Sequence, residues 1–211
     1  SGLQQRQLLT CSALLQVLQL ELLVEDLYQL TNMKRPPNIS ESIDMLKAKG
    51  FSVFKDLAHP YNLNIVGYRD TRGTPNQYND WLNVYWRVKK DQTWKERLYP
   101  ITTVPGVPYL TNPLNPKGSA VLAPGQYLGA YSLGLYKGKY ALLQMRDVVV
   151  YRDNDRDFKA ERTLVKDEGL FGIHIHRGSF FSNYVGRNSA GCQVFQSAND
   201  CEDFMDLCAD S

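Results

Sequence analysis

A histidine and a cysteine near the C-terminal end of the chain have the residue types and spacing for nucleophilic chemistry. His176 stands in the run Gly172-Ile-His-Ile-His176-Arg-Gly178, and Cys192 follows sixteen positions later. A thiol with an ordinary pKa of about 8.5 is mostly protonated at neutral pH, but a neighbouring imidazole can remove that proton and hold the thiolate as an ion pair. The pair therefore predicts acyl transfer by a sulfur nucleophile.

The residues around this pair favour a catalytic role for it. His174 lies two positions before His176 in a strand-like run, so both imidazoles should point to the same face of a sheet. Gly191 directly precedes Cys192, and a glycine there lets the backbone approach a substrate carbonyl and leaves N–H groups free for an oxyanion. We expect His176 to be the base and His174 to be structural, with the reverse assignment as the alternative.

The segment resembles the catalytic domain of the L,D-transpeptidase family (YkuD-like). The motif of that family is a histidine, usually followed by glycine, and a Ser-x-Gly-Cys box about 14 to 18 residues later. Here Ile175-His176 takes the first position and Ser189-Ala190-Gly191-Cys192 takes the second. Papain-like enzymes place the cysteine long before the histidine, and caspases place the histidine about 50 residues before the cysteine, so neither arrangement fits.

The resemblance implies a mechanism and a substrate class. Cys192 would attack a carbonyl in a peptidoglycan stem peptide, between the L-centre of the diamino acid and the D-alanine after it, and form a thioacyl enzyme. His176 would act first as general base and then as general acid. Water as acceptor would make the enzyme an L,D-carboxypeptidase or endopeptidase, whereas an amine from a second stem would make it a transpeptidase, and the choice stays open. No cofactor is implied.

The resemblance and their own chemistry also give roles to the polar residues around the pair. Ser189 would orient the histidine or the substrate, and the N–H groups of Gly191 and Cys192 would hold the oxyanion. Arg187 would bind a stem carboxylate by a forked contact, whereas Arg177 would either do the same or be solvated. Tyr184, like Phe180 and Phe181, would line a groove or belong to the core. The candidate substrate-binding residues are Arg187, Arg177, His174 and Tyr184.

Three further hypotheses compete with this assignment. The flanks of the motif differ from the family pattern at Arg177, Ala190 and Gln193-Val194, which leaves room for an inactive cell-wall-binding module of the same fold. His174, His176 and Cys192 could supply three zinc ligands, although no fourth is obvious. The run Asp153–Asp157 resembles a calcium loop but lacks the glycine and glutamate of an EF-hand, so a polar hairpin loop is expected.

Hydrophobic periodicity predicts an α+β chain in which the helices are at the two ends. Leucines at three- and four-residue steps predict a helix over 9–31, packed on the β domain, and a capping-box pattern at Asn38 with a terminal Gly50 predicts a second. Alternating β-branched and aromatic residues predict strands between Leu63 and His176, and a closing helix is expected from Ser197. The strands are expected at 82–88, 94–101, 127–135, 140–145, 148–151 and 171–176, whereas the Pro- and Gly-rich stretch 103–126 is expected to be a connection.

We therefore expect a helical N-terminal region over residues 1–57 and a β-rich, sandwich-like catalytic domain of the L,D-transpeptidase type over residues 58–211. The β-sandwich is what the resemblance implies, and the sequence Gly125-Gln-Tyr127 before a strand pair is compatible with it.

Composition limits the classes of partner and the compartment. The 211 residues carry a net charge of +2, which is too small for a nucleic-acid surface, and the apolar stretch Leu8–Val24 is too interrupted to span a bilayer. Cys201 and Cys208 are expected to be buried thiols, with a bridge to Cys11 as the weaker alternative. The partner expected from the resemblance is the peptidoglycan stem, so an extracytoplasmic location is expected. The protein would reach it by export, or by release on lysis if it belongs to a phage or mobile element. The oligomeric state is not predicted.

Overall fold

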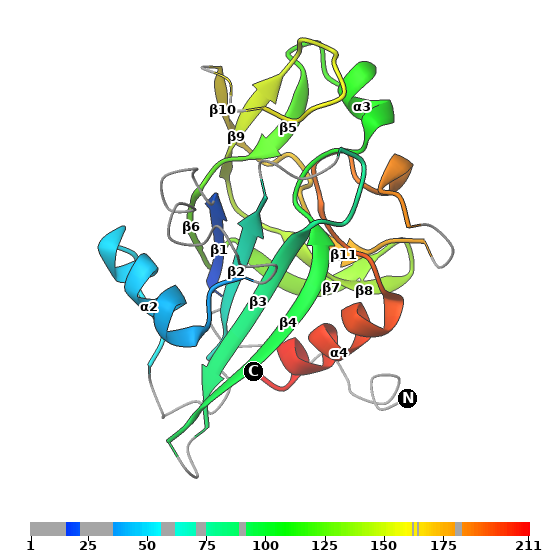
Figure 1. Cartoon of the computed structure of the whole chain (residues 1–211). Helices are drawn as coiled ribbons and strands as arrows, with labels where there is room; N and C mark the ends of the chain where they lie inside the picture. Colours follow the sequence, from blue (N-terminus) through cyan, green and yellow to red (C-terminus); the bar gives the residue numbers. More distant parts are fainter. Residues whose placement is uncertain are drawn as a thin grey trace.

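The computed structural model describes eight parts of the chain, and the fold is α+β with mostly β structure. The described parts are residues 16–21, 36–55, 62–70, 75–88, 92–161, 163, 165–179 and 183–211, of which 16–21 are described by their backbone alone. Figure 1 shows a large curved sheet in the lower part of the view, a small sheet above it, and helices at the periphery. None of the described helices has the length and apolar character needed to cross a membrane.

The large sheet has nine strands and places the two motif segments side by side near its middle. In order across the sheet, the strands are β6 (Gly125–Leu128), β1 (Gln16–Glu21), β2 (Asn64–Arg69), β3 (Asp80–Arg87), β4 (Trp94–Thr102), β12 (Gln193–Phe195), β11 (Ile175–Arg177), β8 (Lys139–Gln144) and β7 (Tyr131–Tyr136). The pairs β1/β2 and β11/β12 are parallel, and the other neighbours are antiparallel.

The two edges of this sheet are close together in space. β6 forms one edge and β7 the other, yet only Gly129 and Ala130 separate them in the chain. Gly129 has a φ of +62°, a backbone conformation that glycine adopts without strain and that allows the chain to turn there. The sheet must therefore curve until its edges nearly meet.

A second sheet of three strands covers the concave side of the first. It has the order β10 (Lys166–Gly169), β9 (Val148–Asp153) and β5 (Ser119–Leu122). One cluster of buried side chains contains Ile65 and Val84 of the large sheet together with Leu122 and Val150 of the small one. The main core therefore lies between the two sheets.

Helices cover the remaining apolar surfaces. Val66, Tyr68 and Tyr85 alternate with the core residues of β2 and β3 and pack against α2 (Ile39–Ala48) on the other face of the large sheet. The helix α4 (Ala198–Ala209) is capped by Ser197 and contributes Phe204 and both of its cysteines to the main core. The helix α3 (Val107–Thr111) and the 3-10 turn η2 (Gly186–Asn188) lie at the end of the molecule that carries the small sheet (Figure 1).

Several local predictions are confirmed in detail. The side chain of Asn38 accepts from the N–H of Glu41, and Glu41 accepts from the N–H of Asn38, which is the predicted capping box. Gly50 follows α2 with a φ of +73°. Cys201 and Cys208 are buried free thiols, and Cys11 lies outside the described residues.

Other predictions are wrong, because long-range pairing overrides local pattern. Within the helix expected over 9–31, Gln16–Glu21 is a strand held between β2 and β6; the rest of that segment lies outside the described residues. The strand expected over 127–135 is divided at Gly129 into β6 and β7. The connection 103–126 contains both α3 and β5, since its prolines and glycines fall at the ends of these short elements.

Candidate active site

Parallel pairing of β11 and β12 brings the two halves of the motif together. Ile175 pairs with Gln193 and His176 pairs with Val194. The N–H of Gln193 donates to the carbonyl of His174 at 2.9 Å, so the pairing extends one residue before the strands and places His174 next to Cys192. Facing residues of paired strands point to the same side, so both histidines and Cys192 lie on one face of the sheet.

Tyr136, at the end of β7, lies against both imidazoles. Its ring centroid is 5.0 Å from that of His174 and 4.9 Å from that of His176, which confirms that the histidines share a face. The ammonium group of Lys137 lies 5.0 Å from the centroid of the same tyrosine ring. An aromatic side chain and a cation from the β7–β8 turn therefore border the site.

His176 is a neutral imidazole with its lone pair on Nε2. Its Nδ1 lies 2.7 Å from the carbonyl oxygen of Arg177. A carbonyl only accepts, so Nδ1 carries the hydrogen and the lone pair of the neutral ring is on Nε2. Burial lowers the pKa of His176 to about 4, with smaller contributions from His174 and Lys137 in the same direction, so the ring is neutral at physiological pH.

His174 has the opposite tautomer. Its Nδ1 accepts a hydrogen bond of 3.0 Å from the backbone N–H of Gln144 in β8, so Nε2 carries the hydrogen. Burial also lowers the pKa of His174, which keeps it neutral. A neutral imidazole whose lone pair is already bonded cannot take a proton from a thiol. Of these two imidazoles, only His176 has a ring lone pair without a hydrogen-bond partner among the described residues.

Cys192 is a half-buried thiol that is protonated at rest. Its Sγ donates to the carbonyl oxygen of Gly172 across 3.4 Å, and no hydrogen bond joins it to His176. Burial raises the pKa of the Cys192 thiol, and this is opposed by the N–H of His174 and the charge of Lys137. Such a thiol needs a base to become a nucleophile at neutral pH.

The cysteine box is held as a tight turn by Ser189. The hydroxyl of Ser189 donates to the carbonyl oxygen of Cys192 at 2.8 Å and accepts from the N–H of Gly191 at 3.1 Å. This side chain is fully buried, so it fixes the turn and does not contact the histidines or a substrate. Gly191 has a φ of +135°, and a Cβ there would lie 2.5 Å from the carbonyl oxygen of Ala120.

The box changes one expectation about the oxyanion. The N–H of Gly191 is bonded to Ser189, so the prediction that it would help to hold an oxyanion is wrong for this resting state. The N–H of Cys192 has no acceptor among the described residues and is available to a developing negative charge.

The residues expected to bind the substrate lie on different elements and do not form one group around Cys192. Arg187 is exposed in η2 and makes no ion pair with any described residue. Arg177 alternates with His176 on β11 and lies near Cys201 of α4, on the opposite face of the sheet, so its predicted role beside Cys192 is wrong. Tyr184 is exposed and forms an isolated bridge with Gln77, whereas Phe180 and Phe181 lie outside the described residues.

No protein-family model, curated protein or solved structure matches this chain. The site is therefore interpreted from its geometry. Among the described residues, which include both histidines and Cys192, no three His, Cys, Asp or Glu side chains are placed to hold one metal ion.

Sequence reasoning missed three contributors to the site. Tyr136 and Lys137 belong to a turn about 40 residues before the motif, and Gln144 acts through its backbone N–H. The side chain of Gln144 also accepts from the N–H groups of Phe171 and Ile173, so it fixes the segment that leads to His174. The sequence Tyr-Lys-Gly-Lys indicates a turn, but no neighbouring residue in the sequence indicates that this turn packs against the two histidines.

The neutral state of His176 predicts a loss of stability in acid. Its pKa is about 4 in the folded chain against 6.5 for the free side chain, so the unfolded state binds a proton first as the pH falls. The free energy of unfolding should drop by up to about 3 kcal/mol between pH 6.5 and pH 4 from this residue alone.

This dependence can be isolated with the variant His176→Asn, in which the amide keeps a donor for the Arg177 carbonyl. Urea unfolding of both proteins at several pH values measures the difference. Parallel curves for the two proteins would contradict the assignment of a buried neutral histidine.

Proposed function

We propose that this chain is a cysteine-dependent acyltransferase of the L,D-transpeptidase type that acts on peptidoglycan stem peptides. The observation that carries the proposal is the pair of opposite tautomers: His174 has its lone pair bonded to β8, whereas His176 has a free lone pair on the face that carries Cys192. The two-sheet core and the intact Ser-x-Gly-Cys box are compatible with that family's fold.

The chemistry follows from these protonation states. When substrate displaces the Gly172 carbonyl from the thiol, Nε2 of His176 takes the Sγ proton, and the sulfur attacks the peptide carbonyl. The oxyanion receives the N–H of Cys192, and the proton on His176 passes to the leaving amine as the C–N bond breaks. Water or an amine then attacks the thioester, with His176 accepting the proton of the acceptor and returning it to sulfur.

The site favours neutral groups at rest. His176 is neutral because burial lowers its pKa, and Cys192 is a thiol because burial raises its own. The charge of Lys137 acts on Cys192 in the direction that stabilises a thiolate, so it favours the ionised sulfur as the proton leaves. The substrate lies outside the cytoplasm, so this function includes an extracytoplasmic site of action.

The test is product analysis with purified disaccharide-tetrapeptides. Mass spectrometry of the reaction should show loss of the terminal D-alanine, and exchange or dimer products when a D-amino acid or a second stem is added. Intact-protein mass spectrometry after exposure to a carbapenem should show one adduct on Cys192. Absence of both products and adduct would contradict the proposal.

The second candidate is a wall-binding module without turnover. One observation favours it, namely that the Cys192 thiol donates to Gly172 and not to His176. Binding of the chain to insoluble peptidoglycan without any change in the muropeptide profile would support this alternative.

A further inference from the structure

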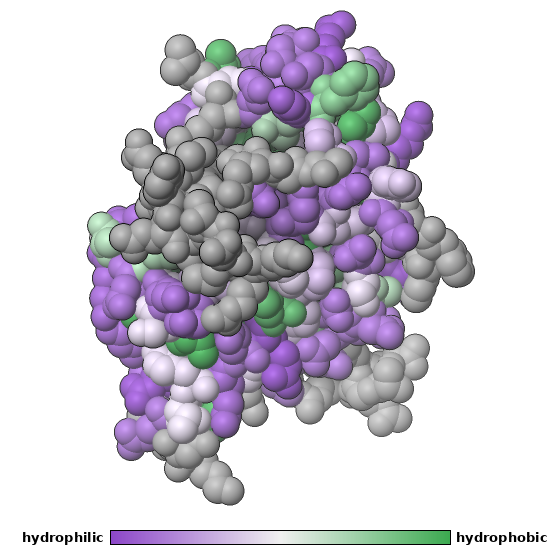
Figure 2. All heavy atoms as spheres, viewed as in Figure 1, coloured by the Kyte–Doolittle hydropathy of each residue, from purple (hydrophilic) through white to green (hydrophobic). Residues whose placement is uncertain are grey.

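A groove of about 360 Å³ lies beside the cysteine box, and the reaction proposed above assigns no role to it. Its walls come from α3, β5, β9 and the segment after β10, with Tyr109, Leu114, Arg152, Leu170 and Phe171 among the lining side chains. Leu114 and Leu170 are 75% and 64% exposed. Figure 2 shows an apolar patch over the region of α3 on an otherwise mainly hydrophilic face.

Three residues in the wall of the groove place it close to Cys192, which is not itself one of the lining residues. Ala190, two residues before the cysteine, is part of its wall. Ala120, also in the wall, lies against the backbone at Gly191. Phe171 directly precedes Gly172, whose carbonyl receives the thiol hydrogen. A substrate bound at Cys192 would therefore have this groove next to its reacting carbonyl.

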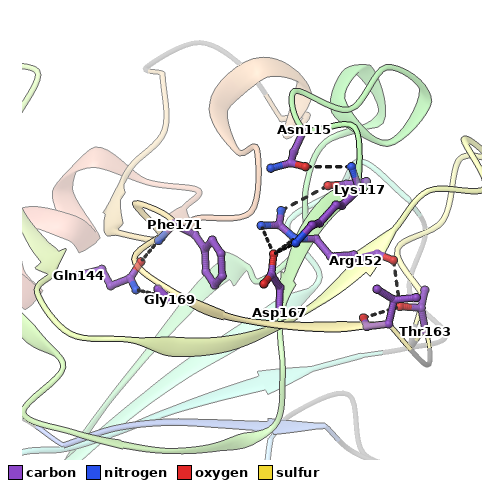
Figure 3. Close-up of polar contacts among 10 residues, drawn as sticks. Asn115, Lys117, Gln144, Arg152, Thr163, Asp167, Gly169 and Phe171 are labelled. Atoms are coloured by element: carbon purple, nitrogen blue, oxygen red, sulfur yellow. Dashed lines mark hydrogen bonds and ion pairs between the residues drawn. The ribbon is translucent and has the colours of Figure 1, made fainter.

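One charged side chain, Arg152, lines this groove, and Asp167 and Lys117 form a charged group with it. Arg152 donates from Nη2 and Nε to one oxygen of Asp167, at 3.1 and 3.3 Å, and Lys117 approaches the same oxygen at 3.4 Å. Burial alone would raise the pKa of Asp167, but hydrogen bonds from the two cations lower it overall, so the carboxylate stays ionised. Two cations and one anion leave one positive charge uncompensated. Figure 3 shows this group beside the ring of Phe171.

Arg152 is fixed in place and still has donors to offer. Its side chain is only 5% exposed, and its guanidinium lies 4.7 Å from the centroid of the Phe171 ring. Nη1 donates to the carbonyl oxygen of Gly118, across 3.4 Å. A guanidinium has five N–H donors, and the contacts to Asp167 and Gly118 use three of them. The remaining donors belong to a rigid cation that lines the groove.

We propose that this groove binds a carboxylate of the acyl donor beside the apolar wall of Leu114 and Leu170. Arg152 in the wall holds the carboxylate, and Lys117, which shares the Asp167 oxygen with Arg152, adds its charge. The inference rests on the function proposed above and specifies its substrate. Two carboxylates of a stem peptide have the required chemistry: the terminal one of the leaving D-alanine, and the one on the side chain of the diamino acid. A rigid guanidinium next to apolar surface suits a carboxylate on a short aliphatic residue.

The test compares Lys117→Gln with a matched control. Lys117 is 66% exposed, so its replacement should leave the fold intact. Lys47→Gln is the control, because Lys47 forms a similar exposed ion pair with Asp44 in α2, far from the groove in sequence and on another element. Lys117→Gln should raise KM for a tetrapeptide about threefold to tenfold with little change in kcat, and Lys117→Glu should raise it further.

Amidated substrates identify the carboxylate. The wild type should bind the peptide less tightly when the recognised carboxylate is a carboxamide, and this difference should shrink in Lys117→Gln and persist in Lys47→Gln. If the difference shrinks for the peptide amidated at its C-terminus, the groove binds the terminal carboxylate. If it shrinks for the peptide amidated on the diamino-acid side chain, the groove binds that carboxylate. A difference that is equal in all three proteins for both peptides would overturn the proposal.

Calorimetric titration of the peptides into Cys192→Ala separates this inference from the proposed function. Carboxylate-dependent binding that is weakened by adding Lys117→Gln supports the groove even if the wild type shows no turnover. Turnover by the wild type together with binding that is insensitive to Lys117→Gln would leave the enzyme assignment in place and reject the groove as a carboxylate site.

Discussion

Replacing Cys192 with alanine is expected to lower kcat/KM on muropeptides by at least about a thousandfold, because no other described group at the site can form the thioacyl bond. The half-buried side chain loses only weak hydrogen bonds, to the Gly172 carbonyl and from the His174 N–H, so the melting temperature should change little. Initial rates followed by liquid chromatography and mass spectrometry measure the activity, and circular dichroism measures the melting.

The matched control is Cys208→Ala. Cys208 is a fully buried thiol in α4 and packs in the main core, so its loss creates a small cavity without touching the site. That variant should be less stable by about 1 kcal/mol and as active as the wild type. The proposed chemistry would be rejected if Cys192→Ala gave the same product profile as the wild type.

Replacing His176 with asparagine is expected to lower kcat/KM by about a hundredfold to ten-thousandfold at pH 7. The amide can still donate to the carbonyl of Arg177, as Nδ1 does, but it has no group in the position of Nε2. The Cys192 thiol, whose pKa is raised by burial, then has no base. The activity that is left should increase with pH as the thiolate forms in solution.

The pH profile of the wild type should differ from that of the variant. Since the pKa of His176 is about 4, kcat/KM for the wild type should be flat from about pH 5 upwards into the alkaline range, and should fall below it as the base is protonated. An acid limb centred near 6.5 would show that the base is not a buried imidazole of this kind.

The corresponding change at the neighbouring histidine provides the control. In His174→Asn the amide oxygen can accept from the N–H of Gln144, so the hydrogen bond that fixes this residue is kept. We expect an activity within about tenfold of the wild type. A larger loss in His174→Asn than in His176→Asn would move the base role to His174.

Local signals in the sequence were sufficient where one short segment decides the outcome. The capping box of Asn38 and Glu41 fixes the start of α2, and its donors and acceptors lie within one turn. The spacing of His174 and His176 decides their common face because a strand alternates with a period of two. The α+β class followed from the capped helix after Asn38 and the strand patterns of the central part of the chain.

The assignments that failed depend on partners far away in the chain. The tautomer of His174 is set by Gln144, thirty residues earlier, and no spacing rule shows that contact. One of the two roles expected for Arg177 placed it beside Cys192, but strand alternation directs it towards Cys201 of α4. Leucine spacing over 9–31 suits a helix, yet Gln16–Glu21 has two strands to pair with, and a β-sheet satisfies both of its backbone edges.

The position of β1 inside the large sheet predicts what happens when the N-terminal segment is deleted. In the strand order of the described residues, β1 lies between β2 and β6 and pairs with both. Removal of the N-terminal segment would therefore expose the hydrogen-bonding edges of β2 and β6. Exposed edges of this kind pair with other chains and cause aggregation. We therefore expect β1, in a segment that the sequence suggested to be an appendage, to protect the protein from self-association.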